Sequence, residues 1–306
     1  MQMREPRAFG LGYVYVILAA GLWALSGTAA KYLFQGGMSP FELVQLRTTI
    51  AAAMLLVWLL AGKRGLLRVA RKDYLYLPLL GITLAAMQFT YLYSISRIQV
   101  AVAVLLQYQA PVLIAAYALL FDKRRLSLVT LVSLFGAVVG CYLMVGAYNL
   151  NLLHMNSSGI ISGLGSAIAF ALYSVRSEYG MRTYAPWTVL FYALLFAAVI
   201  WNVLHPPFSA FHTHYGAFAW RWVLFIGLFG TVLPFGLYNE GIKRISSTRA
   251  SITATLEPVA AGGIAYGFLG EMMEPWQVVG AGLVIASALL LQVEQDPAGQ
   301  RNVKND

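Results

Sequence analysis

Ten long apolar segments occupy most of the chain, and the stretches that join them are short. A helix needs about 20 apolar residues to cross a hydrocarbon core of about 30 Å, and each segment has roughly that length. Charged residues make up only 11% of the 306 residues, whereas soluble domains contain about 25%. The pattern therefore predicts an all-α integral membrane protein with ten transmembrane helices. The segments are 11–34, 41–62, 74–96, 99–121, 126–146, 158–180, 186–204, 218–242, 248–270 and 275–293.

The second half of the sequence repeats the first half at a constant shift of 147 residues. Under this shift "RIQVAVAVLLQYQAPV" from Arg97 aligns without a gap with "RISSTRASITATLEPV" from Arg244, and seven of 25 positions from 97 to 121 are identical. A unit of five spans must enter the membrane from opposite sides in its two copies. Such inverted repeats are typical of secondary transporters, whose substrate site lies near the bilayer midplane. We therefore predict two inverted five-helix repeats around a central cavity.

Lysine and arginine residues are concentrated on one side of this predicted topology. With the N-terminus in the cytoplasm, sixteen lie in cytoplasmic segments, and only Arg97 and Arg221 lie in or beside outer loops. Because cytoplasmic loops of membrane proteins are enriched in basic residues, both termini are predicted to be cytoplasmic in a multi-pass protein of the inner (plasma) membrane. The predicted parts are a cytoplasmic segment at 1–10, the first repeat at 11–146, an outer linker at 147–157, the second repeat at 158–293 and a cytoplasmic tail at 294–306.

One acidic residue, Glu257, falls in the middle of an apolar segment and is followed by Pro258. A carboxylate at the bilayer centre costs roughly 2.5–3.5 kcal/mol on insertion scales, so it usually faces a cavity or a partner. Only the second repeat has this acid, since Ala110 occupies the matching position. We interpret Glu257 as a group that binds a substrate amine or takes up a proton; the alternative is a hydrogen-bonded structural acid.

Pro111 and Pro258 are equivalent positions of the two repeats and are predicted to act as hinges. Each proline leaves the carbonyl one turn earlier without its helical partner; these carbonyls belong to Gln107 and Ala254. Freed carbonyls within a membrane are tolerated where they meet protein, water or ligand. The prolines are thus expected to bend two walls of the central cavity, although a simple packing kink is an equal alternative.

Polar and aromatic residues recur at helical spacing on the segments that would surround this cavity. Aromatic walls with a few hydrogen-bonding groups suit a zwitterion with a variable side chain. The remaining charges within spans are Lys31, Arg47, Arg176 and Glu178. Snorkelling towards the membrane surface explains basic residues near helix ends, and for Arg176 the alternative is a carboxylate anchor. The predicted cavity residues, besides Glu257, are Trp23, Ser26, Gln88, Tyr91, Gln107, Tyr108, Tyr173, Ser174 and Tyr238.

The chain resembles the EamA-type members of the drug/metabolite transporter (DMT) superfamily over nearly its whole length. The resemblance is carried by the paired prolines, the Gly270–Glu271 turn and the ending "AYGFLGEMMEPWQVVGAGLVIASALLL" at 265–291. The first repeat departs from it, with "LLFDKRR" in place of the Gly-Glu turn. Within the superfamily the chain looks like the YddG-like exporters of aromatic and other amino acids. The resemblance implies efflux of small metabolites without ATP.

These observations together predict an amino-acid exporter that works by alternating access, as a monomer in the lipid bilayer. The alternative is a proton-coupled exporter of multiple drugs or cationic metabolites with the same fold. No GxxxxGK[ST] sequence is present, so nucleotide-driven transport is not expected. No catalytic constellation, metal site or cofactor is predicted, and a membrane-embedded enzyme is disfavoured. No nucleic-acid partner is expected, because the net charge of +9 is explained by the cytoplasmic face.

Overall fold

In a computed structural model of the protein, the described residues are 6–149, 156–204, 206, 208–213, 215–264, 266–267 and 272–294. All regular secondary structure within these ranges is helical, and no strand occurs among them. The helices are α1 (Pro6–Gln35), α2 (Pro40–Gly62), α3 (Tyr76–Arg97), α4 (Val100–Gln107), α5 (Ala110–Leu120), α6 (Leu128–Met144), α7 (Ser157–Gly180), α8 (Pro186–Leu204), α9 (Ser209–His212), α10 (Ala217–Gly227), the π-helix η5 (Leu228–Val232), α11 (Leu233–Ala254), α12 (Leu256–Ile264) and α13 (Pro275–Val293), with short 3₁₀ turns η1 (Arg64–Leu67), η2 (Arg71–Asp73) and η3 (Ala147–Asn149).

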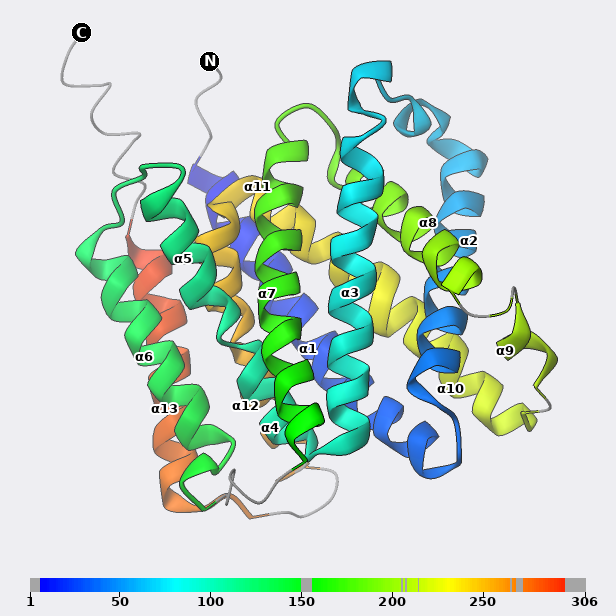
Figure 1. The fold of residues 1–306 in the computed structure, drawn as a ribbon. Coiled ribbons are helices and arrows are strands. Elements are labelled where there is room, and N and C mark those ends of the chain that lie inside the picture. The colour runs from blue at the N-terminus through cyan, green and yellow to red at the C-terminus, as the bar shows by residue number, and fades with distance from the viewer. Residues whose placement is uncertain are drawn as a thin grey trace, which may run out of the picture.

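Eight helical segments among these residues are long and apolar enough to cross a membrane. The longest, Ala217–Ala254, has 38 residues, and the apolar helix Leu128–Met144 is shorter than the eight. Within the longest segment Ser246 has φ 75° and ψ 161°, and the chain turns back there (Figure 1). The structure thus supports a multi-pass membrane protein, while ten crossings and their inverted symmetry stay predictions.

Several helices begin at sequence signals that satisfy their free backbone N–H groups. Ser39 and Glu42 form a capping box at the start of α2, where Pro40 occupies the first turn. The Ser127 side chain accepts a hydrogen bond from the Thr130 N–H group at the start of α6. Such caps pair N–H donors that have no partner within the helix, and proline costs nothing at the first helical position. The helix starts therefore follow from local sequence.

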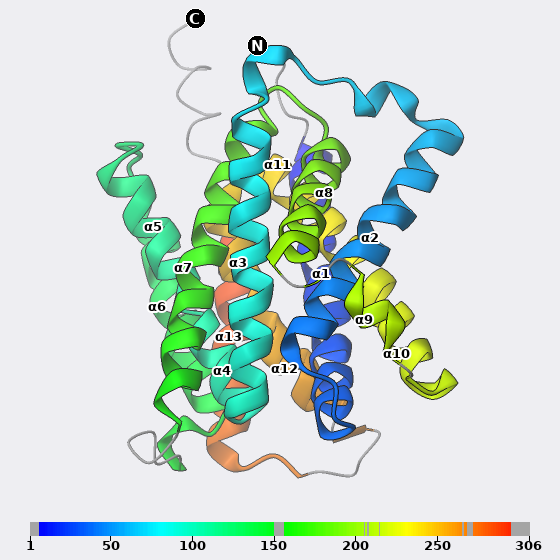
Figure 2. The same cartoon turned by 45° about the vertical axis from the view of Figure 1, so that its right-hand side comes forward.

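Helices α6 and α13 pack closely along one side of the bundle (Figures 1 and 2). Glycines allow this approach: a β-carbon at Gly280 would lie 2.5 Å from the Met144 backbone nitrogen, and one at Gly140 would lie 2.9 Å from the Gly280 oxygen. Small residues bring membrane helices together because backbones can then touch. On the other side, α1 packs on α11, and α3 packs on α7 and α8.

Helix α1 begins, and α13 ends, at the same end of the bundle (Figures 1 and 2). The connections 63–75, 121–127 and 181–185 lie at that end as well (Figure 1). They contain most of the basic loop residues, so we refer to this end as the basic end. The chain reversal within α11 is also there, because Ser247 donates hydrogen bonds to Glu178 near the end of α7.

Candidate functional site

A cavity lies where helices from both halves of the chain meet. Its space for the centres of water molecules is about 40 Å³, which is enough for a few waters at about 10–15 Å³ each. A dry cavity that binds benzene measures about 150 Å³, so a ligand of that size needs the surrounding helices to move. The lining residues are Trp23 and Ser26 of α1, Arg47 of α2, Met87, Gln88 and Tyr91 of α3, Gln107 and Tyr108 at the end of α4, Phe170 of α7, Phe235 of α11 and Glu257 of α12.

Two breaks in the helices bring Tyr108 and Glu257 to this cavity. Helix α4 ends at Gln107 and α5 begins at Ala110, with Pro111 in its first turn. Helix α11 ends at Ala254 and α12 begins at Leu256, two residues before Pro258. Proline has no N–H group and clashes with the preceding turn, which explains why each helix is interrupted just before it. Whether the breaks move during function remains a prediction.

The Glu257 side chain is buried, with 7% of the residue exposed. Its Oε2 atom accepts a hydrogen bond of 2.7 Å from the Tyr108 hydroxyl. Across the described residues, no lysine or arginine forms an ion pair with it within 4.0 Å. A buried carboxylate is costly unless it is paired, so a cationic ligand group in the cavity would stabilise Glu257.

Gln88 faces the same cavity and is only 1% exposed. Neither its amide nitrogen nor its amide oxygen has a hydrogen-bond partner. Buried polar groups are nearly always paired, and an orphaned group signals water, a ligand or strain. Gln88 can donate to one ligand oxygen and accept from one ligand N–H group.

Arg47 also lines the cavity, although the sequence pattern assigned it no role there. The residue is 6% exposed, its Nε donates to Thr231 Oγ1 at 3.1 Å and its Nη2 donates to the Gly230 carbonyl at 3.0 Å. Both acceptors belong to the π-helix η5. The available signal was a lone arginine within an apolar segment, which is itself a mark of function in membranes.

Three predicted cavity residues, Tyr173, Ser174 and Tyr238, lie outside the lining. Tyr173 and Tyr238 come one helical turn after Phe170 and Phe235 along helices that run towards the basic end. The Ser174 hydroxyl lies 2.9 Å from the Tyr238 hydroxyl, so both groups pair with each other rather than face the cavity. These three residues thus lie on the same helices as the lining residues Phe170 and Phe235, about one turn closer to the basic end.

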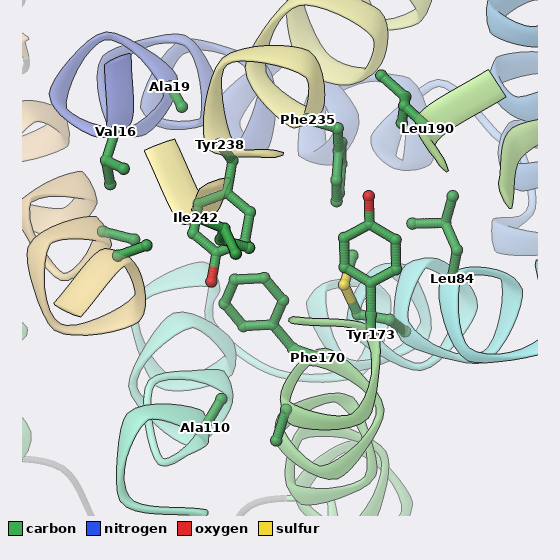
Figure 3. Close-up of a cluster of buried hydrophobic side chains, with 14 of the residues drawn as sticks. Val16, Ala19, Leu84, Ala110, Phe170, Tyr173, Leu190, Phe235, Tyr238 and Ile242 are labelled. Carbon is green, nitrogen blue, oxygen red and sulfur yellow. The ribbon is translucent and has the colours of Figure 1, made fainter. Parts of the chain in front are cut away.

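An aromatic layer separates the cavity from the basic end. The Trp23 ring contacts Phe235 and Tyr238 with centroid distances of 5.1 and 5.4 Å, and Phe170 contacts Tyr238 at 5.4 Å. Figure 3 shows the Phe170 ring between Tyr238 and Tyr173. We define the aromatic layer as Trp23, Phe170, Tyr173, Phe235 and Tyr238. Because all but Trp23 are buried, the layer closes this side of the cavity.

Beyond the aromatic layer, Glu178 joins three segments at the basic end. Its carboxylate accepts hydrogen bonds from the backbone N–H and the hydroxyl of Ser247, which follows the chain reversal in α11. It also accepts from Arg124 Nη1 at 2.7 Å. Arg124 in turn pairs with Asp122 at 3.1 Å. Glu178 therefore ties α7, the connection after α5 and the turn within α11 together.

The other charges within the spans lie away from the cavity lining. The Lys31 Nζ donates to the Ile95 and Ile98 carbonyls at 2.7 and 3.3 Å, at the end of α3. Lysine can satisfy free carbonyls at a helix C-terminus, so Lys31 has a structural role. Arg176, for which the sequence offers a carboxylate anchor as the alternative to snorkelling, does not line the cavity, whereas Arg47 does.

Comparison with known proteins gives one family and several relatives. The model of the EamA-like transporter family matches residues 10–146 and again residues 157–293. An uncharacterized transporter of Archaeoglobus fulgidus is 31% identical over 201 residues, covering 66% of this chain and 70% of that protein. The uncharacterized inner membrane transporter YicL of Salmonella typhimurium is 27% identical, covering 92% of this chain and 95% of its own length.

A further relative is the threonine/homoserine exporter RhtA of Escherichia coli, 26% identical over 90% of this chain and 89% of its own length. Among solved structures, the crystal structure of one protein aligns with a TM-score of 0.73 at 20% identity, covering 93% of this chain and 96% of that one. At this identity the structural match concerns the fold alone. The positions Gly270 and Glu271 lie outside the described residues, as do most of 147–157 and all but the first residue of 294–306.

Proposed function

We propose, since this chain belongs to the EamA-like transporter family, that it is a secondary transporter that exports amino acids by alternating access. Its relatives are transporters, and the chain is accordingly a membrane transporter acting on small molecules. The finer statement, that the cargo is an amino acid and the direction is outward, is the proposal. It includes a monomer in the inner membrane with both termini in the cytoplasm.

The observation that carries the proposal is the buried carboxylate of Glu257, which faces the cavity and forms no ion pair with a lysine or arginine among the described residues. A substrate ammonium group would supply the missing charge, and charge-assisted hydrogen bonds are about twice as strong as neutral ones. Gln88 offers a second polar contact. The rings of Trp23, Tyr91 and Phe170 form the walls, which would hold a substrate side chain without demanding one chemistry.

The proposed transport cycle uses two five-helix units, 11–146 and 158–293, joined at 147–157. The two matches of the family model are spaced by the same shift that aligns the halves of the sequence, which supports this division. Because basic residues favour the cytoplasmic side, the basic end faces the cytoplasm. The units rock against each other around the cavity, and the breaks before Pro111 and Pro258 act as hinges.

In this cycle the aromatic layer and Glu178 form the inner gate, closed in the present structure. Tyr173, Ser174 and Tyr238 then belong to the gate, not to the substrate site. Opening requires Phe170 to part from Tyr238, since these rings come from α7 and α11. Substrate from the cytoplasm would enter through this layer and then reach Glu257.

One observation favours the alternative, a proton-coupled exporter of cationic compounds. Glu257 is a titratable group in the cavity whose only described hydrogen-bond partner is a neutral tyrosine hydroxyl, so it could exchange a proton for a cationic substrate. Under that alternative the carboxylate must release and rebind a proton in each cycle. If the cargo is an amino acid that moves down its own concentration gradient, transport requires no such step.

Exchange of labelled amino acids across proteoliposomes tests the proposal. The purified protein is reconstituted with internal L-threonine, homoserine or L-phenylalanine, and uptake of the labelled compound is followed with and without a pH gradient. We expect exchange without a pH gradient and at least about tenfold weaker exchange in Glu257→Gln, because loss of a charge-assisted contact costs about 1.5–3 kcal/mol. Glu240→Gln, which removes a carboxylate outside the cavity lining, serves as the control.

The proposal fails if neither these three compounds nor, in the same assay, any other of the twenty amino acids is exchanged. Transport of cationic compounds that is driven by a pH gradient and abolished in Glu257→Gln would establish the alternative instead. Equal loss of exchange in Glu257→Gln and Glu240→Gln would remove the role assigned to the cavity.

A further inference from the structure

We propose that Arg47 binds the carboxylate of the transported amino acid, so that the cavity recognises both charges of a zwitterion. This inference rests on the proposed function and names a residue that neither the sequence pattern nor the relatives assign. The starting observation is that Arg47 and Glu257 line the same cavity. Neither forms an ion pair with the other or with any further residue in the part of the chain that the structure describes.

Arg47 is buried, and no counter-charge pairs with it among the described residues. Arg47 is 6% exposed, and its partners are a hydroxyl and a backbone carbonyl, both neutral. A buried guanidinium that lacks an anion is costly, and membrane proteins retain such groups mainly for function. A substrate carboxylate would neutralise Arg47 while the substrate ammonium neutralises Glu257. A zwitterion therefore satisfies both costs at once, whereas a simple cation or anion satisfies only one.

Arg47 has more hydrogen-bond donors than its two described bonds use. A guanidinium has five N–H groups in one plane, and the two described bonds use Nε and Nη2. The remaining donors, at Nη1 and the second hydrogen of Nη2, form the fork that matches a carboxylate with two parallel bonds. The π-helix therefore holds the inner side of the guanidinium and leaves its outer edge for a ligand.

The π-helix η5 supplies both oxygen atoms that hold Arg47. The Thr231 hydroxyl donates to the Ile226 carbonyl at 2.9 Å, so its oxygen lone pairs are available to accept from Arg47. Gly230 approaches α1 so closely that a β-carbon there would lie 2.6 Å from the Ser26 β-carbon. Single π-turns within α-helices are frequent at functional sites. The wide turn thus presents two oxygens to Arg47 at the cavity wall.

The internal repeat places an uncharged residue opposite each of the two cavity charges, Arg47 and Glu257. The shift of 147 residues pairs Arg47 with Leu194, and Glu257 with Ala110. Both Leu194 and Ala110 are fully buried apolar residues, with no exposed surface. In one half of the chain each position therefore packs, while in the other half it carries a charge into the cavity. Each repeat contributes one charge of opposite sign, an asymmetry that helix packing does not require.

Competition by chemically matched probes tests the inference in the reconstituted protein. Exchange of labelled L-threonine is challenged with unlabelled L-threonine and with L-threonine methyl ester, which keeps the ammonium group and lacks the carboxylate charge. For the wild type we expect the ester to compete about 10- to 100-fold more weakly, the range for a charge-assisted pair of hydrogen bonds. In Arg47→Gln this difference should fall to about threefold or less, and Arg47→Lys should lie between the two.

Arg176→Gln is the matched control, since Arg176 is also an arginine within a membrane span but does not line the cavity. It should keep the full preference for L-threonine over the ester. The same probes are also compared by thermal stabilisation of the purified protein, which reports binding even where transport is lost. If Arg47→Gln does not fold, Arg47→Lys decides instead, because it keeps the charge but loses the planar fork and should show a smaller preference for L-threonine over the ester than the wild type does.

Two outcomes are distinguishable. If the wild type exchanges no amino acid, the proposed function fails, and carboxylate recognition is then judged from thermal stabilisation by L-threonine against its ester. If the ester competes or stabilises as well as L-threonine, or if Arg47→Gln keeps the wild-type preference, the role of Arg47 is refuted while amino-acid export stands.

Discussion

Replacing Glu178 with glutamine should open the gate at the basic end. The Glu178 carboxylate accepts two hydrogen bonds from Ser247 and one from Arg124. Glutamine keeps one acceptor oxygen but presents an N–H₂ group to the remaining donors, so these bonds are lost or weakened. Because Ser247 follows the chain reversal in α11, the change releases that turn from α7.

The magnitude follows from the exposure of the partners. Hydrogen bonds to a charged group contribute about 1.5–3 kcal/mol, and the Ser247 contacts are of this kind. The Arg124 side chain is 37% exposed, so its ion pair is screened by solvent and adds at most about 0.5 kcal/mol. A total of about 2–3 kcal/mol shifts the ratio of closed to open molecules by roughly 30- to 150-fold, at 1.4 kcal/mol for each tenfold change.

Cysteine labelling measures this shift directly. Cys141 is the single cysteine of the chain, so Cys141→Ala provides a background without thiols. Ser174→Cys then places a thiol within the gate, where the Ser174 hydroxyl pairs with Tyr238, at a position with no exposed surface. We expect a water-soluble maleimide to label this thiol about 10- to 100-fold faster when Glu178→Gln is added, up to the shift calculated above.

Glu240→Gln is the control for this experiment. Glu240 makes its ion pair with Arg244 within the same helix α11, so the same loss of charge breaks no contact between helices. A labelling rate in Glu178→Gln no faster than in the Cys141→Ala, Ser174→Cys background would refute the gate. Faster labelling in both variants would show instead that general loss of negative charge loosens the basic end.

Three further predictions follow from single sites. Gln88→Leu should leave the melting temperature unchanged or raise it, because both amide atoms lack partners. The same variant should weaken competition by L-threonine about three- to tenfold, through loss of a polar contact to the substrate. A lower melting temperature would contradict this prediction. Gly280→Ala should destabilise the protein by about 1–3 kcal/mol through overpacking against Met144, which would lower the melting temperature. Gly282→Ala is the control and should not lower it, because the space around Gly282 is open. Cysteines at Gly65 and Thr213 should be labelled from opposite membrane sides in intact cells; labelling from one side would overturn the predicted topology.

Much of the bundle could be predicted because its signals are local or periodic. Apolar length indicates the spans, and the capping box at Ser39 and Glu42 marks the start of α2. Proline chemistry indicates the break near Glu257, whose charge in an apolar segment required a cavity or a partner. Of the predicted cavity residues, Trp23, Ser26, Gln88, Tyr91, Gln107, Tyr108 and Glu257 do line one cavity in the structure. Their contact with substrate remains a proposal.

Which residues of a helix face line the cavity depends on their position along the helix, and the helical spacing of the sequence does not indicate that position. Helical spacing shows that Phe170, Tyr173 and Ser174 share a face or lie close to it, but not at which turn the cavity ends. A ring from α11 closes the cavity after Phe170, so the next turn belongs to the aromatic layer. Contact between α7 and α11 decided this, and neither helix alone specifies it.

The sequence alone determined that this chain crosses the membrane repeatedly, that its halves are related, and that Glu257 stands where lipid would not tolerate a charge. These conclusions rest on apolar length, repetition and the energy of burying a charge, which are properties of the residues themselves. The tertiary structure decided that Arg47 meets the same cavity, because its hydrogen bonds reach Gly230 and Thr231, far along the chain. Long-range packing alone brings such groups together, so the second charge of the site became visible only in the folded molecule.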